Sequence, residues 1–196
     1  MIPKLKIHQL WIGDAEMPTC ERAWVEAMQV MHPEADYHFW TEEEGLDTFE
    51  MFRDRKPDFE NPLLAGDLLR YLILEREGGI YLDNDMIPVR PLDAIWEESN
   101  FFAGEEIQGQ LCNALIGVHQ PNHPKLQQLL ENIEKGALNF RNIGVPFFNA
   151  HFWNSDELRR YPREYFHPVY WRVHEDYPPE ITENTYMIHN FSGLWK

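Results

Sequence analysis

Residues 65–85 read AGDLLRYLILEREGGIYLDND, and this stretch decides the fold of the chain. Its first part predicts a helix, because Asn61 followed by Pro62 favours a helix start and Gly78 favours a helix end. After the glycine break, the apolar run Ile80–Leu82 predicts a short buried strand. A helix and a strand in direct succession are typical of an α/β protein.

Two carboxylates, Asp83 and Asp85, follow this strand and are separated by one residue. Ligands of α/β sheets bind beyond the carboxyl ends of strands, and Gly13 lies at a comparable place after the first predicted strand. Carboxylate oxygens at such a place suit an Mg²⁺ or Mn²⁺ ion that holds a diphosphate. The same residues are also common in turns, so the spacing alone leaves a simple turn open.

A charged pair, Asp67 and Arg70, lies on the preceding helix, on one stripe with Leu63 and Leu74. If the stripe faces solvent, the pair is an ordinary salt bridge between neighbouring helical turns. If the stripe faces the protein, burying both charges is costly unless they hydrogen-bond to a further group. Sugar hydroxyls could donate to Asp67 and accept from Arg70. The position of the pair leaves both interpretations open.

The rest of the chain alternates between strand and helix signals. Strands are predicted at residues 5–12, 37–40, 101–103 and 114–118, and helices at 19–32, from the acidic run at 42–44, and at 124–133. Pro88 and Pro91 exclude a long central strand after the carboxylates, and aromatic loops are expected from about residue 139. These patterns predict one α/β domain over residues 1–196, with a Rossmann-like, mostly parallel sheet flanked by helices.

Two of the predicted helices have a definite apolar face. The first is expected to start at a Thr19 cap and to bury Ala23, Trp24, Ala27, Met28 and Met31. The helix at 124–133 is expected to bury Leu126, Leu129, Leu130 and Ile133.

Composition limits the possible partners. A chain of 196 residues can bury a sizeable core, and its net charge of −16 argues against a nucleic-acid or anionic-membrane partner. No segment approaches the roughly 20 apolar residues of a membrane span, and no signal peptide is predicted. Cys20 and Cys112 form neither a CxxC pair nor a disulfide framework, so a reducing, cytoplasmic setting is expected.

Several common catalytic motifs do not occur. The sequence contains no Gly-x-Ser-x-Gly elbow, no Walker loop and no Gly-x-Gly-x-x-Gly, which sets aside serine hydrolase, P-loop and dinucleotide-binding functions. Three histidines follow no metal-ligand spacing and are interpreted as structural: His151, His167 and His174. Taken singly, the residues Trp11, Asn113, His189 and Trp195 would also be read as structural.

Taken together, the residues resemble a known family. The resemblance rests on four segments: IHQLWIG at 7–13, DLLRY at 67–71, GGIYLDND at 78–85 and HNFSGLW at 189–195. They look like the DXD-containing sugar-binding glycosyltransferases, a capsular-polysaccharide and mannosyltransferase-like group related to the clostridial glucosylating toxins.

This resemblance implies a GT-A-like nucleotide-diphospho-sugar transferase fold with a nucleotide-sugar donor and a bound Mn²⁺ or Mg²⁺. The implied donor-binding residues are Trp11 (stacked on the base), Gly13, Asp67, Arg70, Tyr81, Asp83, Asn84, Ser192 and Trp195. The implied metal ligands are Asp83, Asp85 and His189 or Asn190. The implied residues around the reacting sugar are Asp67, Arg70, Asp83, Asp85 and Asn113.

One element departs from the family pattern, because a Thr-Gly-Pro…Thr element is replaced here by Ile143-Gly144-Val145…Asn149. The departure leaves acceptor chemistry open. The expected function is retaining transfer of a sugar from a UDP-sugar to a glycan or other hydroxyl acceptor, as in polysaccharide biosynthesis. The alternatives are a non-catalytic nucleotide-sugar-binding protein and a metal-dependent phosphohydrolase or nucleotidyltransferase.

Overall fold

The computed structural model describes residues 1–13, 15–43, 45–55, 62–107, 109–136, 138–169 and 179–192. In chain order the elements are β1 (Lys6–Leu10), α1 (Thr19–Met31), β2 (Asp36–Trp40), η1 (Leu46–Thr48), α2 (Glu50–Arg55), α3 (Pro62–Glu77), β3 (Gly79–Leu82), β4 (Met86–Pro88), α4 (Asp93–Glu98), β5 (Phe101–Ile107), β6 (Gln110–Val118), α5 (Pro124–Glu134), α6 (Phe140–Ile143), α7 (Val145–Phe152), β7 (Arg159–Tyr161), α8 (Arg163–Phe166) and β8 (Met187–His189).

A six-stranded sheet with the order β2-β1-β3-β6-β5-β7 forms the centre of the molecule. β1 pairs in parallel with β2 and β3, and β5 pairs in parallel with β7. Among these strands β6 alone runs in the opposite direction, since it pairs antiparallel with both β3 and β5. The predicted α/β fold with a mostly parallel sheet is therefore confirmed.

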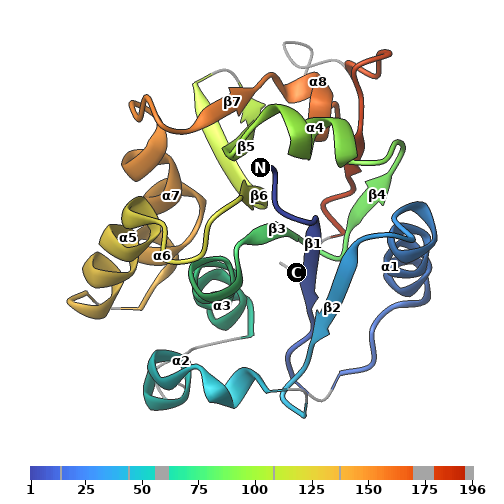
Figure 1. Cartoon of the computed structure of the whole chain (residues 1–196). Helices are drawn as coiled ribbons and strands as arrows, with labels where there is room; N and C mark the ends of the chain where they lie inside the picture. Colours follow the sequence, from blue (N-terminus) through green and yellow to red (C-terminus); the bar gives the residue numbers. More distant parts are fainter. Residues whose placement is uncertain are drawn as a thin grey trace.

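Helices cover both faces of this sheet, and Figure 1 shows β1 between α3 and α1. Successive side chains of a strand point to opposite faces. In β3, Tyr81 packs into a core with side chains of α3, α5 and α7, while Ile80 and Leu82 pack into a second core with α1, α4 and α8. A strand covered on both faces needs a continuous apolar run, which explains the sequence Ile-Tyr-Leu before the carboxylates.

The glycine pair between α3 and β3 is required by geometry. Gly78 and Gly79 have φ angles of 64° and 97°, which side chains disfavour. A Cβ on Gly79 would lie 2.8 Å from Nε2 of His8 and 2.9 Å from the carbonyl of Lys6. The pair thus ends the helix and lets β3 approach β1 closely.

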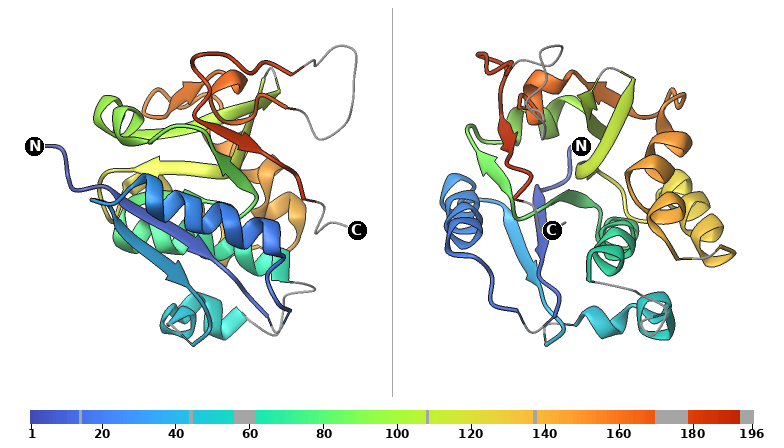
Figure 2. Two further views of the ribbon diagram at one scale, coloured as in Figure 1. Left: turned by 90° about the vertical axis from the view of Figure 1, so that its right-hand side faces the viewer. Right: turned by 180° about the vertical axis from the view of Figure 1, so that it is seen from behind.

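A second, two-stranded sheet lies beside the main one. β4 and β8 pair antiparallel, with Met86 opposite His189 and Pro88 opposite Met187. Figure 2 shows the two strands side by side, green for β4 and red for β8. The pairing brings the last described segment of the chain next to the two carboxylates, and β4 is short, as Pro88 and Pro91 predict.

The predicted helices agree with the structure in part. In α5 the buried residues are the four expected ones, so that prediction is confirmed. In α1 the prediction is wrong in two respects: Pro18 holds the N-cap position without a side-chain cap, and the buried residues are Glu21, Val25 and Met28. Of the five expected residues, only Met28 is buried. Glu21, Val25 and Met28 are separated by four and three residues, so they form a stripe next to the predicted one. Helical periodicity alone did not distinguish the two stripes.

One other prediction needs correction. Glu42 and Glu43 lie in a turn and do not begin a helix; Gly45, with a φ of 107°, precedes η1, and α2 begins only at Glu50. In the aromatic last third, loops connect the short elements α6, α7, β7, α8 and β8. The expected Asn61 cap lies outside the described residues.

Candidate functional site

Asp83 and Asp85 lie in a tight turn at the end of β3. The backbone N–H of Met86 donates to the carbonyl of Asp83 over 3.2 Å, which closes the turn. The side chain of Asn84 donates to the carbonyl of Leu10 over 2.7 Å and ties the turn to the end of β1. The turn therefore presents both carboxylates where the strands β1 and β3 end, which is the ligand-binding edge of such sheets.

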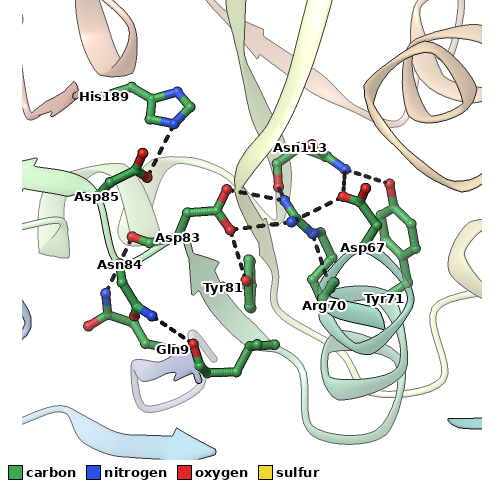
Figure 3. Close-up of polar contacts among 12 residues, drawn as sticks. Gln9, Asp67, Arg70, Tyr71, Tyr81, Asp83, Asn84, Asp85, Asn113 and His189 are labelled. Atoms are coloured by element: carbon green, nitrogen blue, oxygen red, sulfur yellow. Dashed lines mark hydrogen bonds and ion pairs between the residues drawn. The ribbon is translucent and has the colours of Figure 1, made fainter. Parts of the chain in front are cut away.

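Arg70 connects α3 to this turn, as Figure 3 shows. Its Nη2 lies 3.1 Å from Asp67 Oδ1 and 3.3 Å from Asp83 Oδ1, and its Nη1 donates to the carbonyl of Asn113 over 2.7 Å. The side chains of Arg70 and Asp67 are only 8% and 5% exposed. The pair therefore faces the protein and hydrogen-bonds to further groups, which settles the alternative that the sequence left open.

The carboxylate of Asp67 is half satisfied. Asn113 Nδ2 donates to its Oδ1 over 2.9 Å and to the Tyr71 hydroxyl over 3.0 Å, and that hydroxyl donates to the carbonyl of Ile143 over 3.0 Å. Asp67 Oδ2 is buried and has no hydrogen-bond partner in the described part of the chain. Because buried polar atoms normally find partners, this oxygen is an available acceptor for a hydroxyl ligand.

Asp85 is held by the segment that follows β8. Its Oδ1 lies 3.3 Å from Nε2 of His189, and its Oδ2 accepts the backbone N–H of Ser192 over 3.0 Å. Its carbonyl accepts the backbone N–H of Asn190 over 2.9 Å. The pairing of β4 with β8 explains this arrangement, since Asp85 directly precedes β4 and His189 ends β8.

Tyr81 and Gln9 fix the other carboxylate. The Tyr81 hydroxyl donates to Asp83 Oδ1 over 2.8 Å, and Gln9 Nε2 lies 3.4 Å from the Asp83 carbonyl. Both residues come from neighbouring parallel strands, β3 and β1, so the position of Asp83 is set by the sheet itself.

Glu21, a buried residue of α1, extends the site to a third element. Its Oε1 accepts the hydroxyl of Ser192 over 2.6 Å, and its other oxygen has no partner in the described ranges. Burial raises the pKa of Glu21, and the charges of Asp85 and Asp83 raise it further.

The electrostatics of the site follow from burying several carboxylates together. Burial raises the pKa of Asp67 to about 6, against the opposing charge of Arg70. Burial also raises the pKa of Asp83, and the neighbouring Asp85 charge adds to this effect. Burial acts in the same sense on Asp85, but the hydrogen bond and charge of His189 together with backbone hydrogen bonds outweigh it and lower the pKa. Burial lowers the pKa of His189, but the hydrogen bond to Asp85 and the charges of the surrounding carboxylates together raise it.

The residues fit a divalent metal. Ligand atoms of Asp83, Asp85 and His189 lie within 4.8 Å of one another. Carboxylate oxygens suit Mg²⁺ and Mn²⁺, and a positive ion would compensate the carboxylate charges that now raise the pKa of Asp83. The Asn190 side chain is exposed and its backbone N–H serves Asp85, so its role as a ligand stays a prediction.

Trp11 and Gly13 lie beyond the carboxyl end of β1. The Trp11 indole N–H donates to the carbonyl of Ala15 over 2.6 Å. A pocket of about 390 Å³ is lined by Trp11, Met17, Arg22, Val25, Gln29 and Phe39. A larger pocket of about 550 Å³ lies between α2 and α3 and includes no predicted site residue. Trp195 lies outside the described residues.

The structure also contributes residues that the sequence did not single out for a role in the site. Tyr71 and Gln9 lie inside the segments quoted for the family resemblance, but no role was predicted for them. For Glu21, the only sequence signal of burial is its place one helical turn before Val25. Among the histidines, His151 bonds Asn132 and the Phe147 carbonyl, as a structural residue would.

His167 differs from His151, because its ring lies near Cys112 and His189. The third histidine interpreted as structural, His174, lies outside the described residues.

The fold is shared with known glycosyltransferases. The structure is similar to the PaToxG glycosyltransferase, with a TM-score of 0.58 and 21% identity over 76% of this chain and 69% of that chain. It is also similar to an active-site mutant of LgtC, with a TM-score of 0.54 and 11% identity over 94% of this chain and 86% of that one. The chain therefore has the GT-A fold of these glycosyltransferases.

Sequence comparison gives the family. Residues 18–102 match the glycosyltransferase sugar-binding region containing the DXD motif. The chain is 30% identical to inositol phosphoceramide mannosyltransferase 3 of Schizosaccharomyces pombe, over 100% of this chain and 54% of the relative. It is 26% identical to the uncharacterized glycosyltransferase L373 of Acanthamoeba polyphaga mimivirus, over 100% of this chain and 84% of the relative. Residues 18–102 of the chain therefore carry the sugar-binding region of the DXD-containing glycosyltransferase family.

The chain spans about half the length of the fungal mannosyltransferases it matches. It covers 54% of the Schizosaccharomyces pombe protein and 48% of mannosyl phosphorylinositol ceramide synthase SUR1 of Saccharomyces cerevisiae, to which it is 25% identical over 89% of its own length. Within the seven described ranges, no helix is both long and apolar enough to span a membrane.

Proposed function

We propose that this chain is a metal-dependent glycosyltransferase that transfers a sugar from a nucleoside-diphosphate sugar, in the first instance a UDP-sugar, to a glycan or other hydroxyl acceptor. One observation carries the proposal. The unpartnered Oδ2 of Asp67 belongs to the same ion-pair network as Asp83, through Arg70. An acceptor for sugar hydroxyls is thus linked to the turn that suits a metal-bound diphosphate.

Asp67, Arg70 and Asn113 form the sugar side of the proposed donor site. Asp67 Oδ2 accepts a hydrogen bond from a sugar hydroxyl, while Oδ1 stays occupied by Asn113 and Arg70. The guanidinium of Arg70 keeps Asp67 and Asp83 at fixed positions relative to each other. Because these contacts already exist in the protein alone, binding the sugar requires little rearrangement.

Asp83, Asp85 and His189, or Asn190 in its place, form the metal side. A divalent ion held there would stabilise the negative charge that grows on the departing nucleoside diphosphate. Tyr81 and Asn84 keep the carboxylate turn in position for this contact.

The base and phosphate contacts complete the proposed donor site. Trp11 stacks on the base beside Gly13, with the pocket of about 390 Å³ as the space next to the indole ring. Ser192 and Trp195 contact the phosphates. For Ser192 this requires its hydroxyl to leave Glu21, to which it now donates.

We propose transfer with retention of the anomeric configuration, following the resembled family, and no general base is assigned. The altered element Ile143–Asn149 has structural contacts: the Ile143 carbonyl accepts the Tyr71 hydroxyl, and Asn149 Oδ1 accepts the backbone N–H of Leu111 over 2.8 Å. Through Tyr71, the first of these contacts supports the side of the site that holds Asp67 and Asn113.

The relatives narrow the substrates that we test first. Their names describe mannose transfer to inositol phosphoceramide. We therefore propose mannose as a second donor sugar and an inositol-containing glycolipid headgroup as one hydroxyl acceptor.

The decisive experiment measures binding and turnover in the same preparation. The chain is screened by thermal shift with UDP-glucose, UDP-galactose, UDP-N-acetylglucosamine and GDP-mannose, each with Mn²⁺, Mg²⁺ or a chelator. A donor at about 100 times its Kd stabilises the fold by about 2.7 kcal/mol. The best donor is then incubated with glycan and inositol acceptors, and the products are identified by mass spectrometry.

Each alternative has its own outcome. Release of the nucleoside diphosphate together with a glycosylated acceptor supports the transferase. Metal-dependent binding without turnover supports a nucleotide-sugar-binding protein. Release of a sugar phosphate supports a phosphohydrolase or nucleotidyltransferase, and no metal-dependent binding of any donor would overturn the proposal.

A further inference from the structure

Cys112, His167 and His189 form a second cluster of metal-ligating side chains, on the buried side of His189. Their ligand atoms lie within 4.8 Å of one another, and the side chains come from β6, from the residue after α8, and from β8. All three residues are buried, with at most 8% of their surface exposed. The rings of His167 and His189 meet edge to face, with centroids 5.3 Å apart.

The imidazole of His167 is unsatisfied. Its residue is fully buried, and neither Nδ1 nor Nε2 has a hydrogen-bond partner within the described residues. The Nδ1 of His189 also has no hydrogen-bond partner within these residues, while its Nε2 lies next to Asp85. Buried imidazole nitrogens are normally paired, so three such atoms around one thiol need an explanation.

Local packing leaves the space for this ring. A Cβ on Gly104 would lie 3.0 Å from Cδ2 and 3.2 Å from Nε2 of His167, so the glycine in β5 admits the imidazole against the sheet. On the same hairpin, Glu106 is a buried carboxylate whose charge acts on the thiol of Cys112. The cluster is thus a thiol and two imidazoles, gathered from three parts of the chain.

We propose that Cys112, His167 and Nδ1 of His189 bind a thiophilic divalent cation of the zinc class. Thiolate and imidazole are the ligands that tetrahedral zinc prefers, whereas Mg²⁺ and Mn²⁺ favour oxygen. This site is distinct from the carboxylate turn and shares only His189 with it. Binding converts the Cys112 thiol to a thiolate, and its proton leaves through Glu106 or to solvent.

The chemistry of the free cluster agrees with a metal site. Burial and the charge of Glu106 raise the pKa of the Cys112 thiol, so the thiol is protonated without a metal. Burial lowers the pKa of His167 well below its ordinary value, which keeps the ring neutral with a lone pair available. A neutral imidazole with a free nitrogen is the form that binds metals.

The shared histidine makes the two sites compete. A neutral imidazole has one lone pair, on Nδ1 or on Nε2. When Nδ1 binds the thiophilic cation, Nε2 keeps its proton and donates to Asp85, a carboxylate–histidine–metal arrangement that is common at zinc sites. His189 is then unavailable to a metal at the carboxylate turn. Occupancy of the buried site therefore weakens metal-dependent donor binding, a consequence that rests on the proposed function.

The test uses Co²⁺, whose thiolate complexes absorb in the near ultraviolet and whose tetrahedral complexes absorb strongly in the visible. The purified chain is titrated with Co²⁺ as wild type, Cys112→Ser, His167→Gln and Cys20→Ser. Cys20 is the matched control, because it is the exposed cysteine of the chain. Circular dichroism checks that each variant is folded.

The expected result is a thiolate band in wild type and Cys20→Ser that is absent in Cys112→Ser, with Co²⁺ affinity reduced roughly 10-fold or more in His167→Gln. Zn²⁺ should abolish the band. No thiolate band in wild type, or an equal band in Cys112→Ser, would overturn the site.

A second measurement separates this inference from the proposed function. One equivalent of Zn²⁺ should lower Mn²⁺-dependent donor affinity in wild type by about 10-fold, and not in Cys112→Ser. If the cobalt band forms but no donor binds, the proposed function fails and the metal site stands. If donor binds and Zn²⁺ leaves its affinity unchanged, the proposed competition between the two sites is wrong.

Discussion

The hydroxyl of Ser192 donates a hydrogen bond of 2.6 Å to Glu21, a residue of the first helix. The backbone N–H of the same serine donates to Asp85. One residue of the last described segment is therefore bound both to α1 and to the carboxylate turn. Because the donor phosphates are proposed to contact this serine, the Glu21 bond holds the segment in place before a donor arrives.

Glu21→Ala should loosen this segment. Loss of a hydrogen bond to a charged group costs about 1.5–3 kcal/mol, so hydrogen exchange at residues 190–192 should be roughly 10-fold faster or more. Exchange is measured by mass spectrometry on peptides from the last segment. The control is Glu26→Ala, because Glu26 lies on the exposed face of the same helix. Equal protection in both variants would show that Asp85 alone holds the segment.

Asp85→Ala should remove the Mn²⁺-dependent part of donor binding while the protein stays folded. Asp85 offers a carboxylate to the proposed metal and orients His189. The measurement is the thermal shift by donor with Mn²⁺ and with a chelator, with Asp36→Ala, an exposed position on β2, as control. A metal-dependent shift that persists in Asp85→Ala contradicts the metal assignment.

Local patterns were enough to predict the helix, the strand and the turn between residues 62 and 85. α3, the glycine break, β3 and the carboxylate turn are continuous in sequence, and each has its own signal. The sequence could not decide whether Asp67 and Arg70 face the protein or the solvent. Because α3 is buried on most of its surface, its apolar residues show only a weak helical periodicity, which does not identify a buried face.

Long-range pairings could not be predicted from the sequence by itself. The register of Met86 with His189 joins residues about a hundred positions apart, and no local signal encodes it. The direction of β6 and the place of Glu21 are likewise decided by tertiary packing. Only the family resemblance pointed to His189 and Ser192, and it gave no indication of Glu21, Cys112 or His167.

Tyr71→Phe should destabilise the protein by about 1–3 kcal/mol. The hydroxyl is fully buried, accepts from Asn113 and donates to the Ile143 carbonyl, so its removal leaves both groups without this partner. The measurement is the midpoint of urea unfolding, with Tyr165→Phe, a half-buried tyrosine outside this network, as control. A loss below about 0.5 kcal/mol would mean that water replaces the hydroxyl.

Trp11→Ala should weaken nucleoside-diphosphate binding by about 1–3 kcal/mol if the indole stacks on the base. Binding is measured by calorimetry with UDP and Mn²⁺. Trp24→Ala on α1 is the control, because this half-buried tryptophan does not line the pocket that contains Trp11. Unchanged affinity in Trp11→Ala would assign the indole to packing alone.

The raised pKa of Asp67 predicts a pH dependence with a definite sign. In the folded protein the carboxyl releases its proton near pH 6, but in the unfolded chain it does so near its ordinary value of 3.8. Between these values the folded state binds more protons, so this group makes the free energy of unfolding fall as the pH rises from about 4 to 6.

Asp67→Asn removes that titration. The difference in stability, variant minus wild type, should therefore rise by on the order of 1–3 kcal/mol between pH 4 and pH 6.5, and stay level above it. Urea unfolding with a chelator present measures it, and exposed Asp36→Asn should show no such rise. A difference that is flat over this range would mean that Asp67 is ionised throughout and that Arg70 compensates its burial completely.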